Sequence, residues 1–307
     1  MKKGTDIKLL LTEQLYRFIY NFIDPEQLRR EHHWPHPRKG WLEPRTGPGS
    51  GIRFLDFYSI EGIEFALEQY GIYQKIRRQG FDELRLELRR ASEGYDVLKL
   101  FASNCEAPLV ELVAQVGELG YAARKFVPEQ GRRFLHVRWL RMQNPLKTPE
   151  PEKPLLPGQD HPGLGIGREM MALLQMTCVR LELDGIVVLP ERLHNAALYF
   201  RRFRFLDPKL QGTLTAVLRD CREHKLAEVA WAVEAGGLLD GRTGKPLRWL
   251  PAEQVLARTG PALEWLESAE YRRQALEEME NCRFVLSSGD LALEEALRTS
   301  PGEGLKP

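Results

Sequence analysis

Hydrophobic and polar positions in the first part of the chain follow two different periods. Over residues 8–30, and again over residues 60–78, apolar side chains recur every three or four positions, which predicts amphipathic helices. Leu84, Leu86 and Leu88 alternate with charged residues, and this period of two predicts a half-buried strand. The pattern therefore mixes helices with strands from the beginning.

Shorter patterned segments continue this alternation. Strands are predicted at 52–58 and 97–101, a helix at 108–119, a hairpin from 124–127 and 134–140, a strand at 185–189 and a helix at 194–202. Strands alternating with helices predict an α/β (α+β) fold, in which helices flank a mixed central sheet.

Composition divides the chain further. Residues 31–51 are rich in proline and glycine, which predicts a loop, and residues 144–162 hold six prolines, which predicts a stiff extended insertion. Segments 213–235 and 251–299 are rich in Ala, Leu and Glu and are predicted to be mostly helical. The expected order is an N-terminal helix and loop (1–51), an N-terminal α/β extension (52–143), the proline-rich insertion (144–162), a ligand-binding half (163–212) and a mainly helical C-terminal region (213–307).

Charge and cysteine usage narrow the class of protein. The 307 residues carry 44 Lys and Arg against 43 Asp and Glu, and a net charge of +1 argues against a nucleic-acid partner. Glu13 and Arg17 interrupt the apolar stretch 9–23, so we expect an amphipathic helix and no membrane span. No signal-peptide core is apparent, and the four cysteines lack metal or disulfide spacing. We therefore expect a cytoplasmic protein.

A glycine-rich stretch carries the clearest chemistry. Gly163, Gly165 and Gly167 alternate with Leu164 and Ile166 directly before a predicted helix. Alternating glycines let a backbone approach a ligand closely, and the helix start adds unpaired N–H groups, so the stretch can bind an anion. A flexible linker is the plain alternative. A dinucleotide fingerprint requires a Gly-x-Gly-x-x-Gly spacing after a strand, whereas a proline-rich loop precedes this turn.

Together with the segments that follow it, this stretch resembles the GNAT superfamily of acyltransferases. That family has Arg/Gln-x-x-Gly-x-Gly/Ala at the turn into a helix, then a strand, and then a helix with an Asn and a Tyr. Here the strand is residues 185–189, and the helix carries Asn195 and Tyr199. Pro162 stands where the family has Arg or Gln, and Arg204 stands where it prefers Gly.

The resemblance implies a GNAT-like central sheet and a site for acetyl-CoA or another acyl-CoA. It implies that an amine attacks the thioester carbonyl, a backbone N–H polarises that carbonyl, and an acid returns a proton to sulfur. The acceptor would be a small-molecule or peptide amine, and a homodimer is compatible with the sequence. The implied roles are pyrophosphate binding by Gly163, Leu164, Gly165, Ile166, Gly167 and Arg168, a contact of Asn195 with the pantetheine end, and general-acid catalysis by Tyr199.

Each of these residues also has a simpler interpretation. Tyr199 can be an ordinary core aromatic, and Asn195 can be a helix N-cap ahead of an alanine-rich run. The general base is not readable from the motif, and His136 and Glu87 are the candidates. Because His136 faces away from Val137 along its strand, it can equally face solvent.

Three further clusters of residues carry candidate chemistry. His32 and His36 have a helical metal-binding spacing, but Pro35 opposes a helix there. Residues 241–246 superficially resemble a phosphate-binding loop but lack its first glycine and its Ser or Thr, so a tight turn is predicted. The basic residues Arg201, Arg202 and Arg204 form either a solvated face or an attraction for a ribose phosphate.

The methionines after the glycine turn have two interpretations. Met170, Met171 and Met176 are expected in the core, with a malleable wall for an acyl chain as the alternative.

The sequence thus favours a GNAT-type acyltransferase that moves an acyl group from acyl-CoA to an amine. The main alternative is a catalytically degenerate GNAT-fold protein that binds acyl-CoA, or no cofactor, and acts as a regulatory or scaffolding module. An acyltransferase that depends on an acyl carrier protein is a third alternative.

Overall fold

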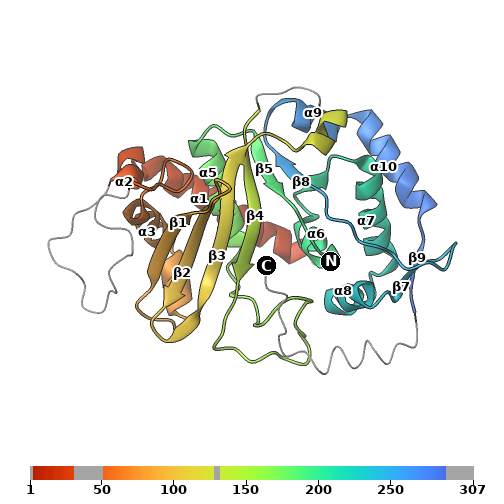
Figure 1. Cartoon of the computed structure of the whole chain (residues 1–307), viewed down its shortest axis with the longest axis horizontal. Coiled ribbons are helices and arrows are strands. Elements are labelled where there is room, and N and C mark those ends of the chain that lie inside the picture. Colours follow the sequence, from red (N-terminus) through yellow and green to blue (C-terminus); the bar gives the residue numbers. More distant parts are fainter. Residues whose placement is uncertain (1–2, 31–50, 128–131, 288–307) are drawn as a thin grey trace. The chain divides into compact units, whose positions relative to one another are not determined.

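The computed structural model describes residues 3–30, 51–127 and 132–287. The fold is mixed α/β, with helices flanking a seven-stranded, mostly antiparallel sheet in the order β1-β2-β3-β4-β5-β8-β6 (Figure 1). The chain divides into two compact units that interleave along the sequence, because strand β4 is shared between them.

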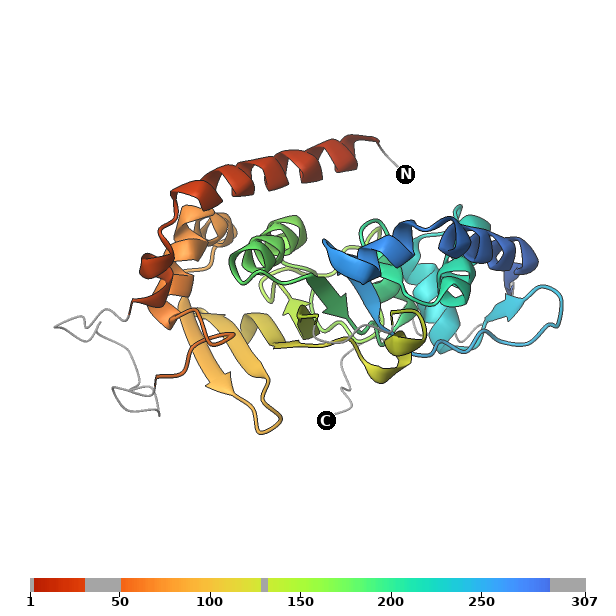
Figure 2. The same cartoon turned by 90° about the horizontal axis from the view of Figure 1, so that it is seen from above.

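The first unit comprises Met1–Val116, Val137–Asn144 and Gly163–Leu181. Its helices gather on one face of its strands (Figure 2). The elements are α1 (Lys3–Phe22), α2 (Pro25–Arg29), α3 (Ile60–Gln69), α4 (Ile72–Arg77), β1 (Arg85–Arg90), β2 (Asp96–Ala102), β3 (Cys105–Gly117), most of β4 (Phe134–Met142) and α5 (Gly167–Arg180).

The second unit comprises Gly117–His136, Pro145–Pro162 and Glu182–Pro307. Its strands β7 and β9 form a separate antiparallel ribbon. The elements are the 3₁₀ helix η1 (Tyr121–Lys125), β5 (Gly185–Val188), α6 (Leu193–Tyr199), β6 (Arg204–Phe205), α7 (Pro208–Asp220), α8 (Leu226–Glu234), β7 (Leu238–Asp240), β8 (Gln254–Ala257), α9 (Gly260–Glu267), α10 (Ala269–Asn281) and β9 (Phe284–Leu286).

Alternation along β1 and β2 separates two faces of the first unit's strands. Leu86 pairs with Leu100, and both side chains are buried. On the other face Glu87 pairs with Lys99, whose ammonium lies 2.7 Å from a carboxylate oxygen of Glu111 on β3. The predicted half-buried strand is confirmed, and Glu87 belongs to its polar face.

Several predicted helices are confirmed. The helical pattern over residues 60–78 forms α3 and α4, which are separated at Gly71, whose φ of 70° ends a regular helix. Residues 8–30 form α1 and α2. The expectation that Met170, Met171 and Met176 belong to the core is also confirmed, since each is less than a tenth exposed.

The prediction of a helix at residues 108–119 is wrong. These residues lie largely in the long strand β3, which pairs antiparallel with β2 through Val110, Leu112 and Ala114. Apolar residues recur here at spacings that fit either period. The neighbouring strand, which supplies hydrogen-bond partners, decided between the two.

The predicted strand at residues 52–58 is a tight turn instead. Leu55 and Asp56 have φ values of 54° and 57°, and Phe54 bridges to Tyr58. The buried carboxylate of Asp96 stabilises this turn by accepting the Leu55 N–H at 2.6 Å. Left-handed backbone at two non-glycine residues costs free energy, so this distant hydrogen bond is part of what maintains the turn.

Two further regions differ in detail from the sequence predictions. The first arm of the predicted hairpin is the 3₁₀ helix η1, whereas the second arm is β4 as expected; Gln130 and Gly131 lie outside the described residues. The C-terminal region is mainly helical through α7 to α10, but it also supplies strands β7, β8 and β9, which the sequence pattern did not indicate.

Candidate functional site

The glycine turn, residues 163–167, lies in the first unit, and exposed and buried residues alternate along it. Gly163, Gly165 and Gly167 are exposed, whereas Leu164 and Ile166 are each only 1% exposed. The two apolar side chains therefore anchor the segment in the core. The glycines leave the opposite side of the backbone open to solvent.

Hydrogen bonds fix the start of this turn. Gly163 forms an antiparallel bridge with Gln143, and the Leu164 N–H donates to the Met142 carbonyl at 3.2 Å. These bonds hold the start of the turn against the end of β4. The proline-rich insertion therefore connects Gln143 and Gly163, which lie next to each other in the first unit.

Gly165 is the position where glycine is required. Its φ is 75°, and a Cβ placed there would meet no atom within 4 Å. The backbone conformation, and not a lack of space, disfavours other residues at this position. The same open space is what a ligand would need in order to approach the backbone.

Helix α5 starts directly after the turn and is 14 residues long. Its N-cap is Ile166, and among the described residues no side chain accepts a hydrogen bond from its first N–H groups. Arg168 is exposed in the first turn. Unpaired N–H groups and the positive end of the helix dipole favour an anion at this position.

Residues of and after α4 support the turn, and the sequence analysis missed them. The Gln79 side chain donates to the Leu164 carbonyl at 3.0 Å and accepts from Asn144 at 3.0 Å. Lys75 forms an ion pair with Glu169, whose side chain is only 3% exposed. These pairs join positions 65 to 94 residues apart, so no local pattern could have predicted them.

Asn195 and Tyr199 lie in the second unit, on α6. The helix begins at Leu193 with Arg192 as its N-cap residue, so Asn195 is inside the first turn. The interpretation of Asn195 as the N-cap is therefore wrong. The Tyr199 ring packs against Phe203 with ring centroids 5.3 Å apart, and burial raises the pKa of its hydroxyl.

His136 also lies in the second unit, at the end of β4 that belongs to it. Burial lowers the pKa of its imidazole, while the charge of Glu253 and the backbone carbonyls of Glu118 and Gly117 oppose that shift. Its Nε2 atom is buried and has no hydrogen-bond partner among the described residues. His136 is thus a largely buried imidazole whose pKa lies below its ordinary value.

The strands of the second unit separate His136 from α6. Phe134 and Val255 share one hydrophobic cluster, and His136, two residues after Phe134, faces the same side. Gln254 faces the other side, where its amide donates to a backbone carbonyl of α6. His136 and Tyr199 therefore lie on opposite faces of these strands.

The remaining sequence candidates have local structural roles. Arg204 donates to the Phe203 carbonyl at 3.0 Å and lies over the Phe200 ring, so it closes the end of α6. The stretch 241–246 is a tight turn, as predicted, in which the Asp240 carboxylate accepts the Thr243 N–H at 2.8 Å. His32 and His36 lie outside the described residues.

Within residues 3–30, 51–127 and 132–287, no cluster of His, Cys, Asp and Glu could hold a metal ion. No helix in these same segments is long and apolar enough to cross a membrane. No protein-family model matches the chain, and no similar curated protein was found.

Proposed function

We propose that this protein is a GNAT-type acyltransferase, in which the glycine turn at residues 163–167 binds the pyrophosphate of an acyl-CoA. The observation that carries the proposal is the alternation of exposed glycines with buried Leu164 and Ile166 ahead of an uncapped helix. A flexible linker without contacts to the core would leave Leu164 and Ile166 exposed, whereas both side chains are buried. A backbone anion site needs that arrangement.

The proposed reaction is direct transfer of the acyl group, with acetyl as the first candidate, to an amine of a small molecule or peptide. The amine nitrogen forms a bond to the thioester carbonyl carbon, and the carbon–sulfur bond breaks. The amine proton passes to a base, and the thiolate takes a proton from an acid. Tyr199 is the candidate for the acid, because a tyrosine hydroxyl is protonated at neutral pH and can donate its proton.

A specific observation also favours the second candidate function, a degenerate acyl-CoA-binding module. His136 and Tyr199 face opposite sides of the second unit's strands, so one pocket on one face cannot use both. If His136 is not the base, turnover depends on a base elsewhere or on water. A module needs only the glycine turn.

Calorimetry with CoA, followed by a thiol-release assay with acetyl-CoA and a panel of amines, tests both functions. Binding of CoA with thiol release supports the enzyme. Binding without release across the panel supports the module. Absence of CoA binding would overturn both, because each depends on the same turn.

A further inference from the structure

Helix α1 exposes a row of large apolar side chains on the side that faces away from the rest of the first unit. Leu11 and Leu15 are 57% and 54% exposed, and Phe18 and Phe22 are 61% and 73% exposed. The spacing of these four residues is four, three and four, which is the spacing of a coiled-coil seam. We call these four side chains the α1 seam.

The opposite side of α1 is held firmly against the first unit. The Tyr16 hydroxyl donates to the Tyr70 carbonyl at 3.1 Å, and Glu13 accepts from Gln175 on α5 at 3.0 Å. Tyr16 itself is 2% exposed. Because these inner contacts fix the rotation of the helix, the seam is presented in one orientation.

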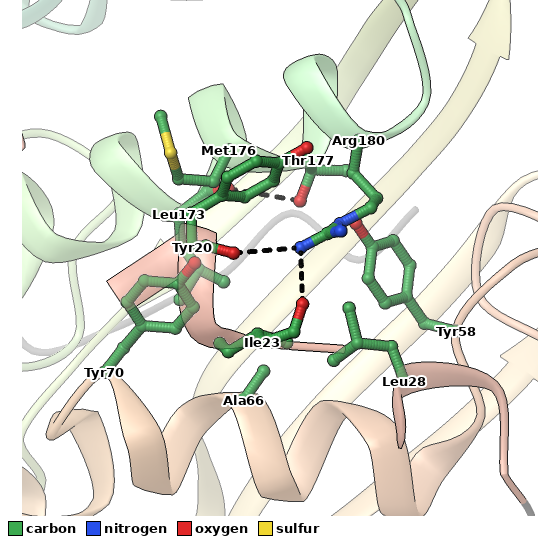
Figure 3. A pocket seen from close by; sticks show the side chains of 10 residues that line it. All are labelled: Tyr20, Ile23, Leu28, Tyr58, Ala66, Tyr70, Leu173, Met176, Thr177 and Arg180. Carbon is green, nitrogen blue, oxygen red and sulfur yellow. Dashed lines mark hydrogen bonds between the residues drawn. The ribbon is translucent and has the colours of Figure 1, made fainter. Parts of the chain in front are cut away.

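The C-terminal end of α1 is anchored by Arg180 of α5 (Figure 3). Its guanidinium donates to the Tyr20 and Ile23 carbonyls at 3.4 and 3.3 Å and lies 4.0 Å from the centre of the Tyr20 ring. The cavity beside it measures about 30 Å³, which is room for roughly one or two water molecules. This cavity is therefore too small for an organic ligand, and Arg180 acts as a structural anchor.

The size of the seam meets the requirement of a helix-to-helix interface. A fully buried aromatic side chain removes about 150–250 Å² from water, so Phe18 and Phe22 leave roughly 250 Å² exposed, and the leucines add about as much again. Two copies of the seam would bury roughly 1,000 Å² in total, near the lower bound of a specific interface. An apolar patch of this size marks an interaction site.

The chemistry of the seam favours another helix over a lipid surface. Helix α1 carries three cations, Lys3, Lys8 and Arg17, against two carboxylates, Asp6 and Glu13, so its charges nearly balance. An interfacial helix on anionic lipid instead carries many cations on its polar face. A neutral apolar seam matches a second neutral apolar seam.

We propose that two copies of this chain pair through their α1 seams in an antiparallel, two-fold arrangement. In this arrangement Leu11 lies opposite Phe22 of the partner copy, and Leu15 opposite Phe18, so a large side chain always meets a smaller one and packing is even along the interface. This inference does not rest on the proposed function.

Sedimentation equilibrium of the full chain tests the proposal, with the double variant Leu15→Glu/Phe18→Glu and the control Leu276→Glu. Leu276 is a leucine of similar exposure, 52%, on α10. We expect the wild type and the control to have the mass of a dimer and the double variant to have half that mass. Circular dichroism should show equal helix content in all three, since the substituted side chains are exposed.

Two results would overturn the proposal. One is a double variant that remains dimeric. The other is a wild type that stays monomeric across a hundredfold range of concentration; flotation with vesicles of anionic lipid would then show whether a membrane covers the seam instead.

Discussion

Helices α5 and α6 carry the residues that the resemblance assigned to an acyl-CoA, and their starts differ in what surrounds their free N–H groups. Neither helix has a side-chain cap within the described part of the chain. The first two residues of α5, Gly167 and Arg168, are exposed, whereas the first two residues of α6, Leu193 and His194, are only 1% and 4% exposed. An uncapped helix start can bind an anion only where its first turn leaves the N–H groups accessible.

Electrostatics reinforce this difference. At α6, the guanidinium of Arg192 lies 3.0 Å from the Glu234 carboxylate, so its charge is already paired. Burial and the neighbouring Arg192 lower the pKa of His194 to about 4, which leaves this imidazole neutral at pH 7. At α5, Arg168 is exposed and available to a phosphate. The substitutions predicted to show this difference lie on α6 and on the turn and first residues of α5.

The largest expected effect is the acid sensitivity that His194 gives to α6. Its pKa is lower in the folded state than the unfolded value of about 6.5, so the unfolded chain binds the extra proton and stability falls as pH drops from about 6.5 to about 4. The full loss is about 3 kcal/mol. Urea unfolding at several pH values measures it, and His194→Gln should flatten the slope; an unchanged slope would refute the assignment.

Replacing the Tyr199 hydroxyl comes next. If the protein is an acyltransferase that uses Tyr199 as its acid, Tyr199→Phe should slow thiol release about 100-fold. The CoA affinity should be unchanged, because the ring still packs against Phe203. Tyr271→Phe is the matched control: its buried hydroxyl donates to the Phe205 carbonyl, so we expect a stability loss of about 1 kcal/mol without a slower release. Full activity of Tyr199→Phe would show that Tyr199 is an ordinary core aromatic and not the acid.

At the start of α5, Gly165→Ala should weaken CoA binding at least about tenfold, since alanine at a φ of 75° strains the turn and narrows the open face. Gly94 has a φ of 83° and equally open surroundings in the β1–β2 turn. Gly94→Ala should therefore cost similar stability, about 1–2 kcal/mol, with no effect on CoA. Calorimetry with CoA on both variants separates loss of ligand contact from backbone strain. Equal CoA affinities of the two variants would contradict the proposal that the glycine turn binds the pyrophosphate.

The smallest effect is expected for Arg168→Ala. An exposed charge–phosphate contact contributes little and is screened by salt, so CoA affinity should fall about threefold at low ionic strength and less at high. Arg222→Ala, at an exposed position in the second unit, is the control. A loss that does not change with salt would mean that Arg168 acts through packing rather than through its charge.

Much of the fold followed from local pattern. The leucine alternation at β1 and the helical period at α3 and α4 are properties of short segments, and the structure confirms them. The helix predicted at residues 108–119 failed because its apolar spacing fits both periods, and β2 decided for a strand. The turn at Leu55 could not be foreseen, since its hydrogen bond comes from Asp96, 41 residues away.

For the candidate site, the sequence alone determined the conformational freedom of the glycines and the order of turn, helix, strand and helix. These are local properties, because a glycine permits its backbone conformation wherever it stands. Only the tertiary structure decided that Gln79 and Lys75 support the turn, and that His136 and helix α6 with Tyr199 lie on opposite faces of the second unit's strands. Such relations depend on which distant segments pair and pack, and strand pairing sets which side chains share a face.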